Sequence, residues 1–386
     1  MIRNEGNNYP TQTAELGRKN PDGYGQQDAC ISVKTEPCLR VHKRTGQKAV
    51  RLVDELNIRD RNFKIGREED HVLIPLNRFP SREEASIIED SLKTFDLVEA
   101  SFEERVRPPH DLVEALEGIL SPHLLASLPK AVDIIGEIAV IEIPSQLGDY
   151  KNVIGEAVMK VNTNVHTVLA KLGPISTPVR VRRFEVISGK GLTETTHHEY
   201  GLALRLDVLR TYFSPRLSTE HERVAAQVRE NEVVVDMFTG VGPFAIQIAA
   251  NRRKVIVYAI DINPHAMRYL MQNIMINKVR GRIVAVLGDS SFIIKNHLSA
   301  VADRVIMNLP REAGRFVEMA CSALKTEGGT LHFYAFSDEP HLSERARNDI
   351  SKALSRADRH LINVETKVVK STAPHEWQIV ADLHVK

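Results

Sequence analysis

The chain has 386 residues, which is too many for one compact core, so two or three domains are expected. Its hydrophobic fraction of 42% and charged fraction of 26% are ordinary for a globular protein, and the net charge of +1 argues neither for nor against nucleic acid. No apolar run approaches about eighteen residues, so no membrane segment is expected. Three cysteines without a CxxC pair argue against a disulfide framework and favour a reduced cytoplasm.

The first eighty residues predict a tail and a small α/β domain. Residues 1–30 are polar and typical of a flexible tail. Residues 31–80 predict a helix over 47–56, strands over 32–41, 60–65 and 71–76, and a linker over 77–82. Eleven Lys and Arg against seven Asp and Glu would allow this domain to position phosphates, although charge alone favours an ordinary solvated surface.

Residues 83–215 predict a middle α+β region. We expect helices over 83–92, 111–120 and 152–172, a strand pair over 131–143, and strands over 179–187 and 203–208 separated by a turn at THHEYG. Within that hexapeptide, His197, His198 and Glu199 are consecutive. Neighbouring side chains of a strand point to opposite faces, so these residues form a poor chelate and we predict no metal site.

Residues 216–386 alternate strand and helix patterns, which predicts a parallel, doubly wound sheet with right-handed crossovers. Strands are expected over 233–237, 255–260, 283–287, 304–308, 329–336, 361–369 and 377–385. The fold class is therefore α/β, with a C-terminal Rossmann-like domain, a middle α+β region and a small N-terminal α/β domain.

Three of these strand ends carry residues suited to a nucleoside cofactor, which binds at the carboxyl ends of strands in such sheets. Gly240 and Gly242 allow a tight turn close to a ligand, and Asp261 ends the next strand, where a carboxylate accepts hydrogen bonds from ribose. Asp289, with Ser290 beside it, could reach an adenine amino group. Asp236 before the turn favours a ligand with a cationic amino group. S-adenosylmethionine has such a group and no phosphate, so we expect it as the cofactor.

The fourth strand ends in Asn308-Leu309-Pro310, a loop suited to holding a base. The carboxamide of Asn308 offers a donor and an acceptor to a base edge, and Pro310 makes the turn rigid. Together with the three strand ends upstream, this loop predicts methylation of a nucleic-acid base rather than an ordinary strand-ending turn.

Four segments, NLPREA, DMFTGVGPF, YAIDINP and YFSPRLSTEHERV, together resemble the archaeal and eukaryotic tRNA guanosine-37 N1-methyltransferases. Residues 38–76 also resemble the small N-terminal tRNA-binding domain of that family. The resemblance extends from about residue 31 to the C-terminus. It implies a class I methyltransferase domain over residues 216–386, a middle RNA-recognition region, and transfer of a methyl group to N1 of the guanosine 3′ to the anticodon.

The resemblance also implies roles for individual residues. Glu220 falls on the general base that accepts the N1 proton, and Arg180, with Arg182 as the alternative, on the donor that stabilises charge at O6. Asn308 would hold the guanine edge, Pro310 would shape the loop, and Tyr212 would pack near the base or the cofactor. The cofactor would be lined by His221, where the family often has Arg, and by Asp261, Ile262, Asp289 and Ser290.

Two alternatives remain open. The related enzymes of wybutosine synthesis transfer the aminocarboxypropyl group of the same cofactor, and a non-enzymic tRNA-binding protein could keep the fold. Asn308 and Glu220 favour methyl transfer over the first, and the intact acidic residues argue against the second. We expect tRNA as the partner, no membrane association, a monomer, and a cytoplasmic location.

Overall fold

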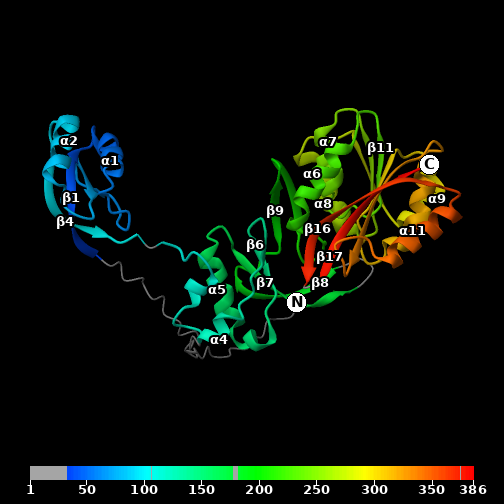
Figure 1. Cartoon of the computed structure of the whole chain (residues 1–386), viewed down its shortest axis with the longest axis horizontal. Helices are drawn as coiled ribbons and strands as arrows, with labels where there is room; N and C mark the ends of the chain where they lie inside the picture. The colour runs from blue at the N-terminus through cyan, green and yellow to red at the C-terminus, as the bar shows by residue number, and fades with distance from the viewer. Residues whose placement is uncertain (1–32, 106, 177–180, 374) are drawn as a thin grey trace, which may run out of the picture. The chain divides into compact units, whose positions relative to one another are not determined.

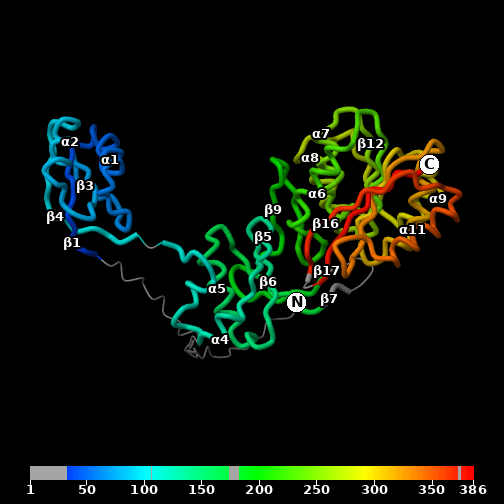
Figure 2. The backbone as a smooth tube through the Cα atoms, in the orientation of Figure 1, coloured from blue at the N-terminus to red at the C-terminus, as the bar shows by residue number. Residues whose placement is uncertain are grey.

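The computed structural model describes residues 33–105, 107–176, 181–373 and 375–386. The described chain forms two compact units, which meet in sequence between Arg107 and Pro108. The course of the backbone within each unit can be followed in Figure 2. Among the described residues, no helix has both the length and the apolar character needed to cross a membrane.

The first unit is a four-stranded antiparallel sheet with two helices (Figure 1). The strands are β1 (Val33–His42), β2 (Gly66–Arg67), β3 (His71–Pro75) and β4 (Asp96–Glu103), and the helices are α1 (Gly46–Glu55) and α2 (Arg82–Leu92). Leu39, Ile74 and Ile88, contributed by β1, β3 and α2, belong to one fully buried cluster. This shared core joins the helices to the sheet.

The first unit extends further along the chain than the expected domain of residues 31–80. The Ser81 side chain accepts a hydrogen bond from the amide of Glu84 and begins α2 in the expected linker. Strand β4 then pairs with β1 from Asp96 to Glu103. Residues 82–103 therefore complete the first unit instead of starting the middle region. The strand expected over 60–65 is also wrong, because that segment forms only one isolated bridge, at Phe63.

The first part of the second unit contains helices and a four-stranded sheet in the order β5-β6-β7-β8. The helices are α3 (Leu112–Leu116), α4 (Pro122–Leu125) and α5 (Lys151–Val161), and the strands are β5 (Val132–Ile135), β6 (Ile138–Ile141), β7 (Thr167–Ser176) and β8 (Val181–Gly189). The helix expected over 152–172 ends at Val161. Val168 and Leu169 continue its apolar spacing but lie in β7, where they pair with Ala139 and Val140 of β6. Sheet pairing thus prevails over the local helical pattern.

A hairpin of β9 (Glu194–Glu199) and β10 (Leu202–Asp207) follows. The expected turn over THHEYG is wrong for its first four residues, which lie in β9. Only Tyr200 and Gly201 form the turn, with φ values of +47° and +79°. Two consecutive positive φ angles match the right-handed twist of a two-residue hairpin.

The last part of the second unit is a seven-stranded sheet in the order β13-β12-β11-β14-β15-β17-β16. The strands are β11 (Val233–Asp236), β12 (Ile256–Asp261), β13 (Ile283–Leu287), β14 (Arg304–Met307), β15 (Gly329–Ser337), β16 (Leu361–Ala373) and β17 (Glu376–Val385). The helices are α6 (Ser218–Gln227), α7 (Pro243–Asn251), α8 (Pro264–Ile276), α9 (Ser290–His297), α10 (Val317–Ala323) and α11 (Glu344–Arg356). The predicted Rossmann-like arrangement is confirmed, except that β17 runs antiparallel to both of its neighbours, β15 and β16.

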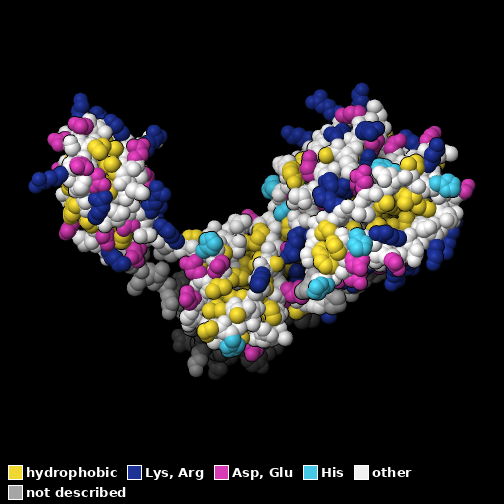
Figure 3. All heavy atoms as spheres, viewed as in Figure 1, with side chains coloured by type: hydrophobic (Ala, Val, Ile, Leu, Met, Phe, Trp, Pro, Cys, Tyr) yellow, Lys and Arg dark blue, Asp and Glu magenta, His cyan; other side chains and the backbone are white. Residues whose placement is uncertain are grey.

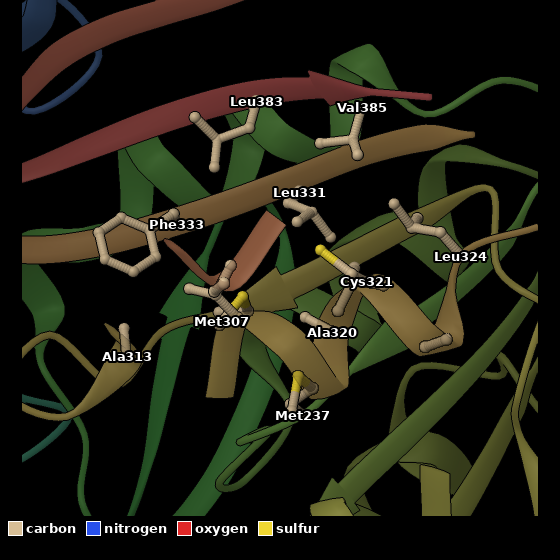
Figure 4. Close-up of a cluster of buried hydrophobic side chains, with 14 of the residues drawn as sticks. Met237, Met307, Ala313, Ala320, Cys321, Leu324, Leu331, Phe333, Leu383 and Val385 are labelled. Atoms are coloured by element: carbon tan, nitrogen blue, oxygen red, sulfur yellow. The ribbon is translucent and has the colours of Figure 1, made fainter. Parts of the chain in front are cut away.

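Helices cover both faces of this sheet (Figure 1). One face buries Met237, Met307, Leu331 and Phe333 with residues of α10, as Figure 4 shows. The opposite face packs Val234 and Tyr334 against α6, α7 and α8. Strand β11 lies between β12 and β14, so the strand order reverses there. In open α/β sheets that reversal opens a crevice at the carboxyl ends of the strands, which is where the predicted cofactor residues lie.

Candidate active site

The glycine turn between β11 and α7 has the conformation that its sequence predicts. Gly240 and Gly242 have φ values of +57° and +88°, which side-chain-bearing residues rarely adopt. A Cβ on Gly242 would lie 2.3 Å from Cδ1 of the fully buried Leu270, so any side chain here would force Leu270 to move. Pro243 then begins α7, where its missing N–H costs no hydrogen bond.

Asp261 connects the glycine turn to the end of β12. Its carboxylate accepts hydrogen bonds from the amide of Gly240 at 2.7 Å and from the amide of Asn263 at 2.8 Å. The carboxamide of Asn263 in turn donates to the carbonyl of Arg210 at 2.8 Å. Three loops are thereby held together. Ile262, beside Asp261, is 47% exposed, so this edge presents an apolar surface next to a carboxylate.

The end of β13 places Asp289 at the surface and Ser290 beneath it. Asp289 caps α9 by accepting a hydrogen bond from the amide of Phe292 at 2.9 Å, while Ser290 is buried at the start of that helix. A carboxylate has about four lone-pair sites, so the cap leaves Asp289 able to accept further hydrogen bonds. Asp261 and Asp289 therefore end adjacent strands, as predicted.

Asp236 lies behind the glycine turn instead of lining an open surface. Its side chain is fully buried, and neither carboxylate oxygen has a hydrogen-bond partner within normal geometry. Burial raises the pKa of Asp236 to about 7, and nearby Asp261 adds to that rise. An unpaired buried carboxylate makes this region favourable for a cationic ligand group. The ammonium of S-adenosylmethionine fits this requirement, and the glycine turn fits close approach of a ligand.

The loop after β14 is the predicted base-binding loop. Asn308 is half-buried, and its Oδ1 accepts a hydrogen bond from Nε2 of Gln378 at 3.3 Å. The turn closes through hydrogen bonds from the amide of Leu309 to the carbonyl of Met307 and from Glu312 to Leu309, with Pro310 between them. Gln378 is 2% exposed and belongs to β17. Sequence reasoning missed it, because nothing near Gln378 in the chain marks it as a partner of Asn308.

Glu220 lies in the first turn of α6 and is only 3% exposed. Its carboxylate accepts hydrogen bonds from the Tyr334 hydroxyl at 2.6 Å and from Nε and Nη2 of Arg223 at 2.8 and 2.7 Å. Arg223 also pairs with Asp382. Arg223 is therefore a partly buried partner of two carboxylates.

Tyr212 and His221 lie on either side of the turn that leads into Glu220. Tyr212 is 40% exposed, and its carbonyl oxygen is the nearest atom, at 3.7 Å, to a Cβ built on Gly240. His221 is buried, with its ring against Phe244 at 4.6 Å and Nδ1 2.7 Å from Glu199. The proposed cofactor contact of His221 stays a prediction, since the ring lies between α7 and β9.

Of the two candidate donors to O6, Arg180 lies outside the described residues, and Arg182 is half-buried in β8. Among the described residues, no group of three His, Cys, Asp or Glu side chains is arranged to hold a metal ion. His197 and Glu199 share one face of β9. Nδ1 of His197 accepts a hydrogen bond from the amide of Gly136, and its ring packs on Phe213.

Three family models match successive parts of the chain. They are the tRNA methyltransferase 5 N-terminal domain over residues 38–84, the TYW2 N-terminal domain over 112–193, and the TRM5/TYW2 methyltransferase domain over 195–362. The chain is also similar to an aminocarboxypropyltransferase acting on 4-demethylwyosine in tRNA(Phe) from Methanocaldococcus jannaschii, 34% identical over 57% of this chain and 86% of that protein.

Relatives that match nearly the whole chain are more informative. The tRNA (guanine(37)-N(1))-methyltransferase Trm5b of Pyrococcus abyssi is 39% identical over 90% of this chain and 98% of the relative, and the M. jannaschii Trm5b is 31% identical over the same shares. The crystal structure of the P. abyssi protein has a TM-score of 0.64 and covers 91% of this chain and 99% of that one. A complex of aTrm5 with tRNALeu has a TM-score of 0.68, 29% identity, and coverage of 90% and 99%. This protein belongs to the tRNA (guanine(37)-N(1))-methyltransferase family.

Proposed function

We propose that this protein transfers the methyl group of S-adenosylmethionine to N1 of guanosine 37, the nucleotide 3′ to the anticodon of tRNA. The observation that carries the proposal is the match to the Trm5b enzymes over nearly their whole length, including the first unit. The site adds a glycine turn, two strand-end carboxylates and the Asn308 loop at one edge of the sheet. S-adenosylmethionine supplies a methyl group on a positively charged sulfur.

The residues of the chain then have distinct tasks in this proposal. Asn308, oriented by Gln378, reads the guanine edge, and Pro310 fixes the loop. Arg180 donates to O6 as negative charge grows there, with Arg182 as the alternative. The N1 proton passes to the carboxylate of Glu220, which Arg223 and Tyr334 stabilise in the ionised, proton-accepting form. Tyr212, His221, Ile262 and Ser290 complete the proposed surroundings of base and cofactor.

The first unit is proposed to bind the tRNA body, and the segment before β9 to contribute RNA contacts. In Figure 3, Lys and Arg side chains are numerous on the visible face of the first unit, although acidic side chains lie among them. Several of these cations are paired, as Arg40 is with Glu68. We also propose a cytoplasmic location, which the buried free thiols of Cys38 and Cys321 support, and a monomer, which sedimentation analysis would test.

Mass mapping of an unmodified tRNA transcript after incubation with the protein and S-adenosylmethionine tests the function. We expect one added methylene unit in the fragment that contains guanosine 37, and none in a transcript with another base there. Gain of an aminocarboxypropyl group would instead support the wybutosine-type reaction, for which the TYW2 N-terminal match is the favouring observation. If calorimetry detected no binding of S-adenosylmethionine, a tRNA-binding protein without activity would be the better description.

The Glu220→Gln variant tests the proton acceptor. Glutamine keeps the size of the side chain but cannot take up the proton, so we expect single-turnover methylation to slow by about 10²–10⁴-fold while tRNA affinity stays nearly constant. An unchanged rate would remove Glu220 from this role without affecting the assignment of the reaction.

A further inference from the structure

A continuous network of buried and partly buried polar side chains extends away from Glu220 across one face of the seven-stranded sheet. His332 and Tyr334 alternate with apolar residues on β15, and Asp382 lies directly opposite His332 on β17. All three are at most 4% exposed. Strand residues two apart share a face, so these side chains project toward α6, which carries Glu220.

Arg223 is the centre of this network, because two carboxylates share its guanidinium. Nε and Nη2 donate to Glu220 at 2.8 and 2.7 Å, while Nη1 and Nη2 donate to Asp382 at 2.5 and 3.1 Å. The Tyr334 hydroxyl donates to Glu220 from the sheet side at 2.6 Å. Burial alone would raise the pKa of Asp382, but hydrogen bonds from His332 and Arg223 hold it well below its usual range.

His332 links Asp382 to a second arginine and has a fixed tautomer. Its Nε2 lies 2.8 Å from Nη1 of Arg304, and its Nδ1 lies 2.6 Å from Asp382. Arginine can only donate, so Nε2 accepts, and Nδ1 carries the proton that it donates to Asp382. Burial lowers the pKa of His332, in keeping with a neutral ring. Arg304 then pairs with Glu232 at 2.9 Å, and Glu232 is the last member of the network.

The charges of the side chains in this network do not cancel. Glu220, Asp382 and Glu232 are three carboxylates, whereas Arg223 and Arg304 supply two positive charges and His332 is neutral. A buried cluster with one surplus negative charge is favourable for taking up one proton, since protonation removes the uncompensated charge. Asp382 contributes to this surplus because it shares Arg223 with Glu220 and accepts two of the four hydrogen bonds that Arg223 donates to the two carboxylates. If Arg223 paired with Glu220 alone, the carboxylate would be compensated and would accept a proton less readily.

We propose that Tyr334, Arg223, Asp382 and His332 form a positioning network for Glu220, in which Asp382 divides Arg223 between two carboxylates so that Glu220 can accept the N1 proton. The inference rests on the proposed function. The groups that face Glu220 are Arg223 from its own helix, Tyr334 from β15, and Asp382 of β17 through Arg223. His221, the next residue of α6, pairs with Glu199 instead.

Two substitutions should move the pH dependence in opposite directions. Tyr334→Phe removes a donor to the ionised carboxylate, so Glu220 should keep its proton to higher pH. Asp382→Asn leaves Arg223 to Glu220 alone, so Glu220 should lose its proton at lower pH. We expect the acid limb of the pH–rate profile to move to higher pH in Tyr334→Phe and to lower pH in Asp382→Asn. Each shift should be about one pH unit, which corresponds to the free energy of about one hydrogen bond to a charged group.

The assay is single-turnover methylation of the tRNA transcript with saturating S-adenosylmethionine, measured from pH 5 to 9 on the full-length protein. Tyr269→Phe is the matched control. Its hydroxyl donates to Glu194 at 2.8 Å and its ring is 3% exposed, but it does not contact Glu220, so its acid limb should coincide with that of the unmodified protein. The apparent KM for tRNA should remain constant in all variants.

The proposal is overturned if both variants keep the wild-type limb, or if both move it in the same direction. Should Tyr334→Phe not fold, the direction of the Asp382→Asn shift alone decides. A wild-type protein that leaves guanosine 37 unmethylated would refute the proposed function instead, and that result is visible before any variant is made.

Discussion

Replacing each glycine of the glycine turn with alanine separates two physical costs. Both residues have left-handed backbone conformations, with φ of +57° at Gly240 and +88° at Gly242. They differ in the space available. A Cβ on Gly240 would have the Tyr212 carbonyl at 3.7 Å as its nearest neighbour, whereas one on Gly242 would lie 2.3 Å from Cδ1 of Leu270.

The expected magnitudes follow from these distances. A left-handed alanine costs about 1–2 kcal/mol, which applies to both variants. Gly242→Ala must also displace the fully buried side chain of Leu270, and such overpacking costs about 1–3 kcal/mol more. We therefore expect the free energy of unfolding to fall by about 1–2 kcal/mol in Gly240→Ala and by about 2–5 kcal/mol in Gly242→Ala.

Urea unfolding followed by tryptophan fluorescence measures this difference. The chain has one tryptophan, Trp377 in β17, so the signal reports the seven-stranded sheet and not the first unit. Affinity for S-adenosylmethionine, measured by calorimetry, should fall more in Gly242→Ala, because the added Cβ would push the turn and the start of α7 away from Leu270 of α8. Equal destabilisation of the two variants would refute the packing argument and leave only the backbone conformation.

Three further predictions concern charge and domain organisation. Burial raises the pKa of Asp236 to about 7, so the cost of its ionised form to protein stability grows as pH rises from about 4 to 7. Asp236→Asn should therefore raise the free energy of unfolding at pH 8 by on the order of 2–4 kcal/mol and leave it nearly unchanged at pH 4. The same variant should weaken S-adenosylmethionine binding. Burial lowers the pKa of Lys370 to about 8, so the free energy of unfolding of the wild type should rise between pH 8 and 10.5. Lys370→Met should abolish that rise and stabilise the protein at pH 7 by on the order of 2 kcal/mol. Urea unfolding at pH 7 and 10.5 measures both effects, and a variant that shows the same pH dependence as the wild type would contradict the prediction. Deletion of residues 1–107 should weaken tRNA binding in a filter assay while S-adenosylmethionine affinity stays constant, and equal loss of both would assign the first unit a structural role.

The local sequence pattern was sufficient to predict a structural feature where all the residues that define the feature lie within one short segment. The apolar run before Asp236, the glycines after it, and the acidic residues at the next two strand ends lie within short windows, and the structure brings them to one edge of the sheet. Positive φ at Gly240 and Gly242 is a property of the turn itself. The strand ends and the turn that carry the predicted cofactor residues were therefore predictable from the order of residues.

Other features needed the tertiary structure because competing local patterns look alike. Val168 and Leu169 continue the helical spacing of α5, but hydrogen bonding to β6 makes them a strand. Likewise, α2 and β4 follow a proline-containing segment that is typical of a linker, and only pairing of β4 with β1 assigns them to the first unit.

The surroundings of Glu220 show the same division most clearly. The sequence by itself, through the family resemblance of the segment YFSPRLSTEHERV, identified Glu220 as the expected proton acceptor, because that signal lies within one short stretch of the chain. Tyr334 contacts Glu220 from 114 positions away, and Arg223 meets Asp382 across 159 positions. Alternation along β15 and β17 places these side chains on the face that α6 covers. Only closure of the sheet decided which charges share that buried space, because low-dielectric pairing depends on distance in three dimensions and not on separation along the chain.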